Sequence, residues 1–339
     1  MNEKKNLTTK KTFALAVQNH KKNNLKVAEN LYNKILKIDP NHIETIFSLG
    51  LLSAQTRKFD KAKQLLQKVI QINPNYANAH FNLGIIFKEL EEYQKAINCY
   101  EKAIQLNPSC TDAYLNLGVI FKNLKEHQKA INCHEKAIQL NPSCTDAYLN
   151  LGVVFEDLKE HQKAISYYKK AIEIQPNYVK AYYNLGIIFN ELEEREKAIS
   201  YYKKAIEIQP NFANAYNTLG NVSENLGEYQ KAISYYKKAI EIQPNFAEAH
   251  TNLGLLLLLL SNFQKGHDEY EWRKKVPTRR DYKLNDIESL EWQGEDLTNK
   301  TILILSEQAV GDTIQFARYL YILQDKYLAT IIFRTRKKL

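Results

Sequence analysis

The stretch INCYEKAIQLNPSCTDAYLNLGV at residues 97–119 returns at residues 131–153 with one change, from Tyr100 to His134. The two copies lie 34 residues apart, and the same step separates seven of the eight prolines, from Pro40 to Pro244. It also separates seven of the eleven glycines, from Gly50 to Gly254. A constant period of this length is typical of repeat proteins, in which each copy is one structural unit.

The residue pattern within one unit, residues 111–144, predicts a pair of helices. Large apolar residues of its first half recur at intervals of three and four and so share one helix face: Tyr114, Leu117 and Phe121. The second half shows another such pattern. Gly118 and Ala130 are small, as expected where two antiparallel helices approach closely. Pro142 cannot continue a helix and is expected to end the second one.

This unit resembles the tetratricopeptide repeat, a helix-turn-helix with small residues at positions 8, 20 and 27 and proline at position 32. Alanine occupies repeat position 20 from Ala62 to Ala232 and repeat position 27 from Ala103 to Ala239. We count eight units, of which the first, residues 9–42, and the last depart from the pattern, as capping units do. The resemblance implies an all-α solenoid over residues 9–280, a right-handed superhelix of helical hairpins.

The composition and the cysteines predict a cytoplasmic protein. The four cysteines are copies of two positions, too far apart in a stack of helices for disulfides, which suits a reducing compartment. The N-terminus lacks the apolar core of a signal peptide, and no apolar run is long enough to cross a membrane. His127 and His161 are expected in turns between helices, without partners at metal-ligand spacing. We therefore predict no membrane, metal or cofactor.

Nucleic-acid binding is the weakest functional interpretation. The chain has 47 basic and 38 acidic residues, a net charge of +9, but the excess is spread over the whole length. The Tyr-Tyr-Lys-Lys sequences at 167–170, 201–204 and 235–238 combine basic residues with aromatic ones, a combination found in nucleic-acid-binding proteins. We expect one tyrosine of each run to pack between hairpins and the lysines to face water beside glutamates, so these runs indicate a solvated helix face.

The candidate binding residues lie on the first helix of each unit. The resemblance places repeat positions 2, 5, 6, 9, 12 and 13 on the inner wall of the superhelix. Position 6 carries asparagines, which can donate and accept hydrogen bonds along the backbone of an extended peptide, and position 9 carries an apolar strip. These residues are Asn82, Asn116, Asn150, Asn184 and Asn252, and Ile85, Val119, Val153 and Ile187. The alternative is that these asparagines belong to an Asn-Leu-Gly sequence that is simply the consensus of the repeat, and this alternative stays open.

The asparagine ladder predicts a protein-interaction scaffold that binds an extended peptide or protein segment in its concave groove. The ladder is similar to that in the repeats of O-linked N-acetylglucosamine transferase. Chaperone-binding repeats instead have lysine at position 13 to clamp a terminal carboxylate. Here that position holds Glu89, Asn123 and Asp157, which disfavours such a clamp. The partner is therefore expected to be a protein or peptide that runs along the groove.

The repeat pattern ends near Val276, and a different periodicity follows a linker at residues 281–299. Thr301–Leu305 is a continuous apolar run of the kind buried in a parallel sheet, residues 313–324 have helical spacing, and residues 329–333 form a second strand. We predict a βαβ unit, the incomplete start of a Rossmann-like domain over residues 300–339.

The segments 266–275 and 290–320 resemble bacterial proteins in which tetratricopeptide repeats precede a heptosyltransferase-like glycosyltransferase domain. The resemblance implies Asp312 as a general base for an acceptor hydroxyl, although capping of a helix N-terminus accounts for the same residue. Ala309 stands where the relatives usually have glycine. One βαβ unit cannot enclose a nucleotide sugar, so we expect no complete active site in these residues. The alternative function is the acceptor-recruiting part of a glycosyltransferase whose catalytic domain is completed elsewhere, and only then would a nucleotide sugar bind.

Overall fold

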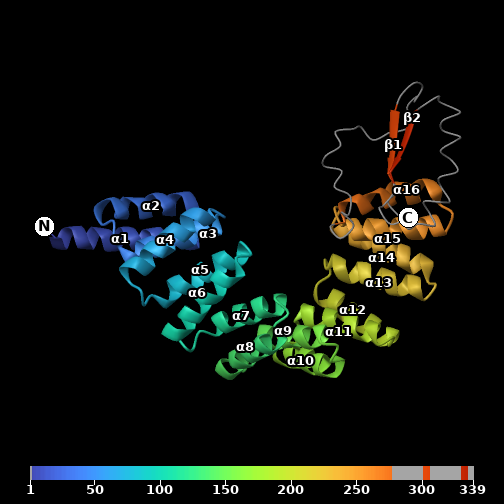
Figure 1. Ribbon diagram of the computed structural model, residues 1–339, viewed down its shortest axis with the longest axis horizontal. Coiled ribbons are helices and arrows are strands. Elements are labelled where there is room, and N and C mark those ends of the chain that lie inside the picture. The colour runs from blue at the N-terminus through green and yellow to red at the C-terminus, as the bar shows by residue number, and fades with distance from the viewer. Residues whose placement is uncertain (1, 277–300, 306–329, 335–339) are drawn as a thin grey trace. The chain divides into compact units, whose positions relative to one another are not determined.

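The computed structural model describes residues 2–276, 301–305 and 330–334 (Figure 1). These residues form sixteen α-helices in consecutive pairs, one 3-10 helix and two strands. The first helices of the pairs are α1 (Asn2–Lys21), α3 (Ile43–Gln55), α5 (Ala77–Glu89), α7 (Thr111–Asn123), α9 (Thr145–Asp157), α11 (Val179–Glu191), α13 (Ala213–Asn225) and α15 (Ala247–Leu259). The second helices are α2 (Leu25–Ile38), α4 (Phe59–Ile72), α6 (Tyr93–Leu106), α8 (His127–Leu140), α10 (His161–Ile174), α12 (Arg195–Ile208), α14 (Tyr229–Ile242) and α16 (Phe263–Tyr270).

The chain divides into two compact bodies, an N-terminal body at Met1–Tyr235 and a C-terminal body at Tyr236–Leu339. The pairs of helices are the predicted hairpins, and the all-α solenoid is confirmed. α8 ends at Leu140, two residues before Pro142, because proline has no N–H to continue the helix. The prediction that His127 and His161 lie in turns was wrong, since they are the first residues of α8 and α10.

Each turn between the two helices of a hairpin contains one residue in the left-handed backbone region. Only one of these eight residues is a glycine, Gly227, with φ of 74°. The other seven carry side chains: Asn23, Arg57, Glu91, Lys125, Lys159, Glu193 and Ser261. A left-handed conformation costs a non-glycine residue about 1–2 kcal/mol, so the packing of the helices on either side imposes this turn.

The predicted small residues mark the places where the two helices of a hairpin meet. A Cβ atom at Gly118 would lie 2.3 Å from Cε1 of His134, and one at Gly152 would lie 2.3 Å from Cε1 of Tyr168. The aromatic rings of the second helices therefore lie directly on the glycines of the first helices. One continuous core cluster runs through the N-terminal body from Ile46 to Val222.

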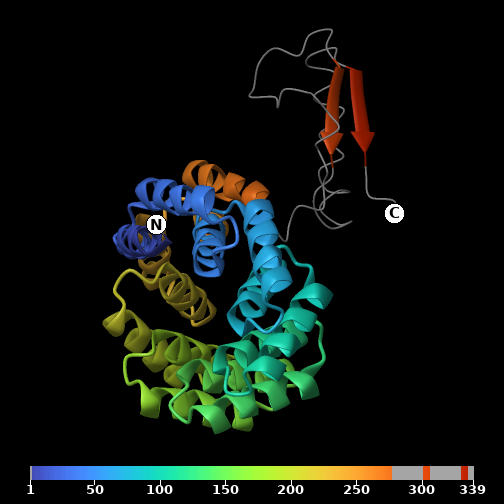
Figure 2. The same cartoon turned by 90° about the vertical axis from the view of Figure 1, so that its left-hand side faces the viewer.

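The hairpins of the N-terminal body follow one another along a curve (Figure 2). Successive first helices contact each other from α1 to α11, whereas successive second helices make no contacts of comparable extent among the described residues. A stack whose hairpins lie closer together on one side bends toward that side. The first helices are therefore on the inside of the curve, as the sequence analysis predicted.

The C-terminal body contains the last hairpin and the two strands. α16 is short and continues into the 3-10 helix η1 (Glu271–Lys275), whose Trp272 ring stacks on His250 at 4.0 Å between centroids. Strands β1 (Thr301–Leu305) and β2 (Thr330–Arg334) pair in parallel, with Thr301 opposite Thr330. The first strand has its predicted bounds and the second begins one residue later. The predicted helix at residues 313–324 and Asp312 lie outside the described residues, so the βαβ unit as a whole stays a prediction.

Candidate functional site

The asparagines of repeat position 6 lie half-buried on the first helices, and two of them donate to their own helix backbone. Asn82 Nδ2 donates to the carbonyl oxygen of Asn78 at 2.7 Å, and Asn116 Nδ2 donates to that of Asp112 at 2.8 Å. One amide N–H of each side chain is therefore used within its helix. Asn150 makes no hydrogen bond to another described residue and keeps its full donor and acceptor capacity.

Position 6 also connects neighbouring units. Lys88 Nζ on α5 donates to Asn116 Oδ1 on α7 at 2.8 Å. Further along the array, the Tyr183 hydroxyl lies 3.2 Å from the Thr218 hydroxyl in the next unit. These contacts hold the polar side chains of adjacent first helices in a fixed order along the inside of the curve.

The apolar strip of position 9 lies beside these polar groups. Ile85, Val119, Val153 and Ile187 are each partly exposed, while their helices pack against the core on the other side. In the C-terminal body, Asn252 is half-buried and Leu255 is 40% exposed at the equivalent positions. Polar and apolar side chains thus alternate on each first helix, which suits contact with both the backbone and the side chains of a bound segment.

Three carboxylates gather near the C-terminal ends of α9 and α11. Glu156 is half-buried and accepts a hydrogen bond from the Tyr168 hydroxyl at 2.7 Å. Burial raises the pKa of Glu156, and the carboxylates of Glu191 and Asp157 raise it further, although the hydrogen bond from Tyr168 opposes them. We call Glu156, Asp157 and Glu191 the carboxylate cluster. One cation pairs with it, since Lys159 Nζ lies 3.5 Å from Glu191 Oε2.

A second tyrosine at the same repeat position, Tyr202, packs against Gly186 of α11. Tyr202 on α12 is fully buried, and its hydroxyl has no hydrogen-bond partner among the described residues. Burial raises the pKa of Tyr202, with smaller contributions from Tyr183 and from the carboxylates of Glu156 and Glu191.

The sequence analysis missed this cluster. Acidic residues at position 13 disfavour a clamp for a terminal carboxylate, but their proximity to an acidic residue at position 12 is not part of the repeat pattern. The available signal was an acidic residue at position 12 followed by another at position 13, Glu156 and Asp157, with Glu191 one unit later.

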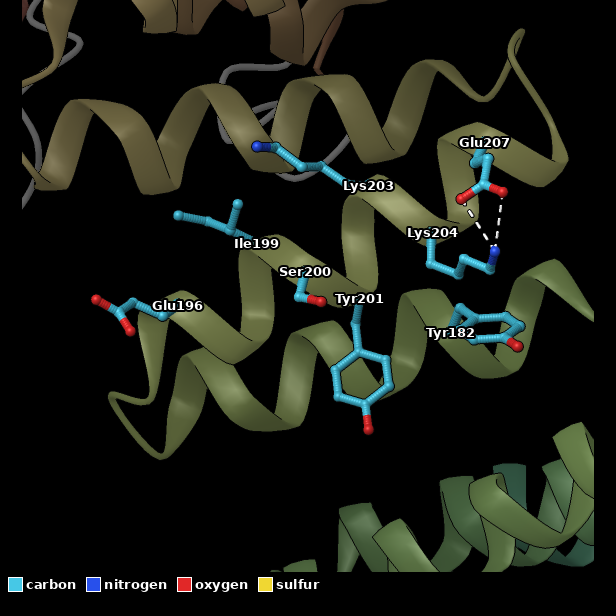
Figure 3. Close-up of a pocket in the computed structure, with 8 residues that line it drawn as sticks. All are labelled: Tyr182, Glu196, Ile199, Ser200, Tyr201, Lys203, Lys204 and Glu207. Carbon is cyan, nitrogen blue, oxygen red and sulfur yellow. Dashed lines mark hydrogen bonds and ion pairs between the residues drawn. The ribbon is translucent and has the colours of Figure 1, made fainter.

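The Tyr-Tyr-Lys-Lys runs on the second helices have the predicted arrangement. Tyr168 and Tyr202 are fully buried, and Lys170 and Lys204 pair with glutamates one turn ahead at 2.7 and 2.9 Å. A hollow of about 660 Å³ is lined by α12 and by Tyr182 of α11. Figure 3 shows the side chains that line it. Its lysines and glutamates pair with each other or face solvent, and it brings together no catalytic set.

The described residues contain no helix with the length and apolar character that crossing a bilayer requires. They also contain no group of three or more histidine, cysteine or acidic side chains arranged to hold a metal ion. The four cysteines are free and partly buried. Burial raises the pKa of Cys99 and Cys133 to about 11, so their thiols stay protonated near neutral pH.

A stack of 34-residue helical hairpins that curves toward its first helices defines an α-solenoid repeat protein. Sequence models described as tetratricopeptide repeats match residues 77–110, 111–144, 143–211, 213–246 and 235–268, and a model described as TPR repeat matches residues 55–91. The chain belongs to the tetratricopeptide repeat family.

Solved structures of repeat proteins are similar to parts of this chain. MamA is 32% identical over 49% of this chain and 97% of its own, with a TM-score of 0.45. YrrB, described as a TPR protein with an unusual peptide-binding site, is 24% identical over 54% of this chain and 95% of its own, with a TM-score of 0.45. The Cut9–Hcn1 hetero-tetramer of the APC/C is 21% identical over 70% of this chain and 46% of its own, with a TM-score of 0.57, and shows the shared fold. A comparison with curated proteins finds no match.

Proposed function

We propose that this chain is a protein-interaction scaffold whose inner face binds an extended peptide or protein segment. The inner face of the N-terminal body consists of the position-6 and position-9 side chains: Asn82, Asn116, Asn150 and Asn184, and Ile85, Val119, Val153 and Ile187. Asn252 occupies position 6 on α15 of the C-terminal body, and we propose the same role for it there. The observation that supports the proposal is the closer approach of successive first helices from α1 to α11, because a stack bends toward the side on which its hairpins lie closer together. Partly exposed apolar side chains beside asparagines offer an extended chain both side-chain burial and backbone hydrogen bonds.

The test is capture of peptides from a random displayed library by the immobilised full chain, followed by affinity measurement on the selected peptides. Changing Asn116, Asn150 and Asn184 to alanine together should weaken binding while helical content is unchanged. The matched control changes Asn98 and Asn132 to alanine, because these asparagines are exposed on second helices. Equal affinities for the triple variant and the control, or failure to select any peptide, would contradict the proposal.

The finer features of the proposal rest on the sequence. They are a cytoplasmic location and the division into a repeat region at residues 9–280, a linker at 281–299 and the start of another domain at 300–339. The likeness of residues 266–320 to glycosyltransferase-bearing repeat proteins supports a role as the acceptor-recruiting part of such an enzyme. Asp312 would then be the general base. Transfer of sugar from a nucleotide-sugar donor by a longer form of this protein, abolished by Asp312→Asn, would test that role.

A further inference from the structure

The excess positive charge of the chain gathers at its N-terminal end, so it is less evenly spread than the sequence analysis assumed. Residues 1–39 hold nine lysines and three acidic residues, an excess of six positive charges, while the whole chain has an excess of nine. Seven of these lysines have exposed side chains: Lys10, Lys11, Lys21, Lys22, Lys26, Lys34 and Lys37. Positive charge therefore concentrates on the first hairpin, α1 and α2.

The acidic groups of α2 and its C-terminal end are engaged elsewhere. Glu29, the one acidic residue within α2, pairs with Lys58 and Lys61 of the next unit at 3.6 and 2.6 Å. Asp39, directly after α2, accepts a hydrogen bond from the backbone N–H of Asn41 at 3.1 Å. The exposed lysines of α2 have no ion-pair partner among the described residues: Lys26, Lys34 and Lys37.

The unpaired state of Lys34 distinguishes the first unit from the next six. At the same repeat position those units carry lysines that each donate to an acceptor: Lys68, Lys102, Lys136, Lys170, Lys204 and Lys238. In five of these units the acceptor is a glutamine or glutamate three residues later, such as Glu173 at 2.7 Å from Lys170. Three residues after Lys34 the first unit instead has Lys37, a like charge.

Lys26 shows the same replacement of an acceptor by a cation. It stands where the next six units have aspartate, glutamine or glutamate, from Asp60 to Gln230. Three positions of α2 that are paired, neutral or acidic in the other units are thus unpaired and basic in the first one.

These lysines share the exposed face of α2 with polar and apolar side chains. Lys26, Lys34 and Lys37 are spaced at intervals that place them on one side of the helix. Val27 is 49% exposed and Ile38 is 58% exposed beside them. A hollow of about 630 Å³ lies on the same helix and is lined by Asn30, Asn33, Lys34, Leu36 and Lys37. The face therefore offers positive charge, hydrogen-bonding groups and apolar contact area together.

This combination fits a protein segment better than a nucleic acid or a membrane. A phosphate backbone would pair with the lysines but leave Val27 and Ile38 without apolar contacts, and α2 has no exposed aromatic ring for a base to stack on. A helix that lies in a membrane surface inserts its apolar face. The apolar face of α2 is buried in the hairpin instead: Ala28, Tyr32 and Ile35.

We propose that the exposed face of α2 is a second interaction surface of the scaffold, which binds an acidic protein segment that also carries apolar residues. The lysines attract and orient the carboxylates of the segment, and the exposed aliphatic side chains bury its apolar ones. α2 is a second helix, so this surface is separate from the inner face that the first helices form.

The test begins with a displayed peptide library whose random positions are restricted to aspartate, glutamate, serine, leucine and valine. Peptides are selected on the full chain, and affinity is then measured for one selected peptide. Changing Lys26, Lys34 and Lys37 to glutamine together should weaken its binding by about tenfold, as expected for the loss of three exposed ion pairs. The matched control changes Lys170, Lys204 and Lys238 to glutamine and should bind as the wild-type chain does. It removes the same charge at the repeat position of Lys34.

Further measurements identify the surface and the class of partner. The variant with alanine at positions 116, 150 and 184 should bind the selected peptide as the wild-type chain does, because its changes lie on first helices. Single-stranded DNA with the same number of charges and vesicles containing phosphatidylserine should bind more weakly than the peptide. The proposal would be overturned by failure to select a peptide, equal losses in the lysine variant and its control, a loss in the alanine variant, or tighter binding of DNA or vesicles. None of these outcomes bears on selection at the inner face from an unrestricted library, which tests the proposed function separately.

Discussion

The fourth unit contains a buried histidine where five other units have a fully buried tyrosine, and its replacement should remove a pH-dependent weakness. His134 on α8 is fully buried, and neither ring nitrogen has a hydrogen-bond partner among the described residues. Burial lowers the pKa of His134 from 6.5 to about 4. The equivalent tyrosines are Tyr32, Tyr100, Tyr168, Tyr202 and Tyr236.

The sign of the effect follows from the direction of this shift. A histidine whose pKa is lowered by folding binds its proton more readily in the unfolded chain, so acid favours unfolding. The contribution of neutral His134 to the free energy of unfolding is fully present above 6.5, its pKa in the unfolded chain. It is lost as the pH falls toward about 4, its pKa in the folded chain. The full difference corresponds to about 3 kcal/mol, of which about 2 kcal/mol is lost between about pH 7.5 and about pH 5.

His134→Tyr should therefore lose less stability on acidification than the wild-type chain, by about 2 kcal/mol at about pH 5. The reciprocal variant, Tyr100→His in the preceding copy of the unit, should gain the same sensitivity. Hydrogen exchange of amides in α7 and α8 is the suitable assay, because repeat arrays open unit by unit. An equal decline of protection with pH in the wild-type chain and His134→Tyr would refute the reasoning.

Three further predictions compare matched positions by urea unfolding. Tyr168→Phe should lower the free energy of unfolding by about 1 kcal/mol because it breaks a hydrogen bond, whereas Tyr202→Phe should leave it unchanged or raise it; the opposite order would contradict this. Gly152→Ala should cost about 1–3 kcal/mol, since its Cβ would lie 2.3 Å from a tyrosine ring, and Gly50→Ala should cost less, with 3.2 Å to a leucine methyl; equal costs would disprove the close-packing argument. Lys125→Gly should raise stability by up to about 1 kcal/mol because Lys125 has φ of 61°; a loss would show that its side chain stabilises the turn.

The fold was predictable because it depends on residues that recur in every unit. Pro142 ends a helix through its own covalent structure, and Gly118 is required wherever an aromatic ring from the second helix occupies its space. Such local causes act in each copy, so the period identified the hairpins, whereas the direction of the curve followed from the resemblance to the tetratricopeptide repeat. The positive φ of the turn residues was not predictable, because Lys125 and Glu193 do not favour that conformation by themselves.

The candidate site was predictable only in part. The positions that face the inside follow from the repeat, but the partners of each side chain depend on differences between neighbouring units. The bond from Lys88 to Asn116 and the gathering of Glu156 and Glu191 each join two units, at residues that the repeat does not keep constant. The prediction at Asp312 concerns a residue outside the described part of the chain, and it stays a prediction.

The contacts between helices of the N-terminal body join each hairpin to the ones directly before and after it. Loss of one whole copy, for example residues 131–164, would therefore bring together surfaces that already fit each other. Recombination between the stretches that encode these two nearly identical amino-acid sequences would lengthen or shorten the array in steps of 34 residues. The number of hairpins, and with it the length of partner that the array spans, is thus open to evolutionary change without any new packing solution.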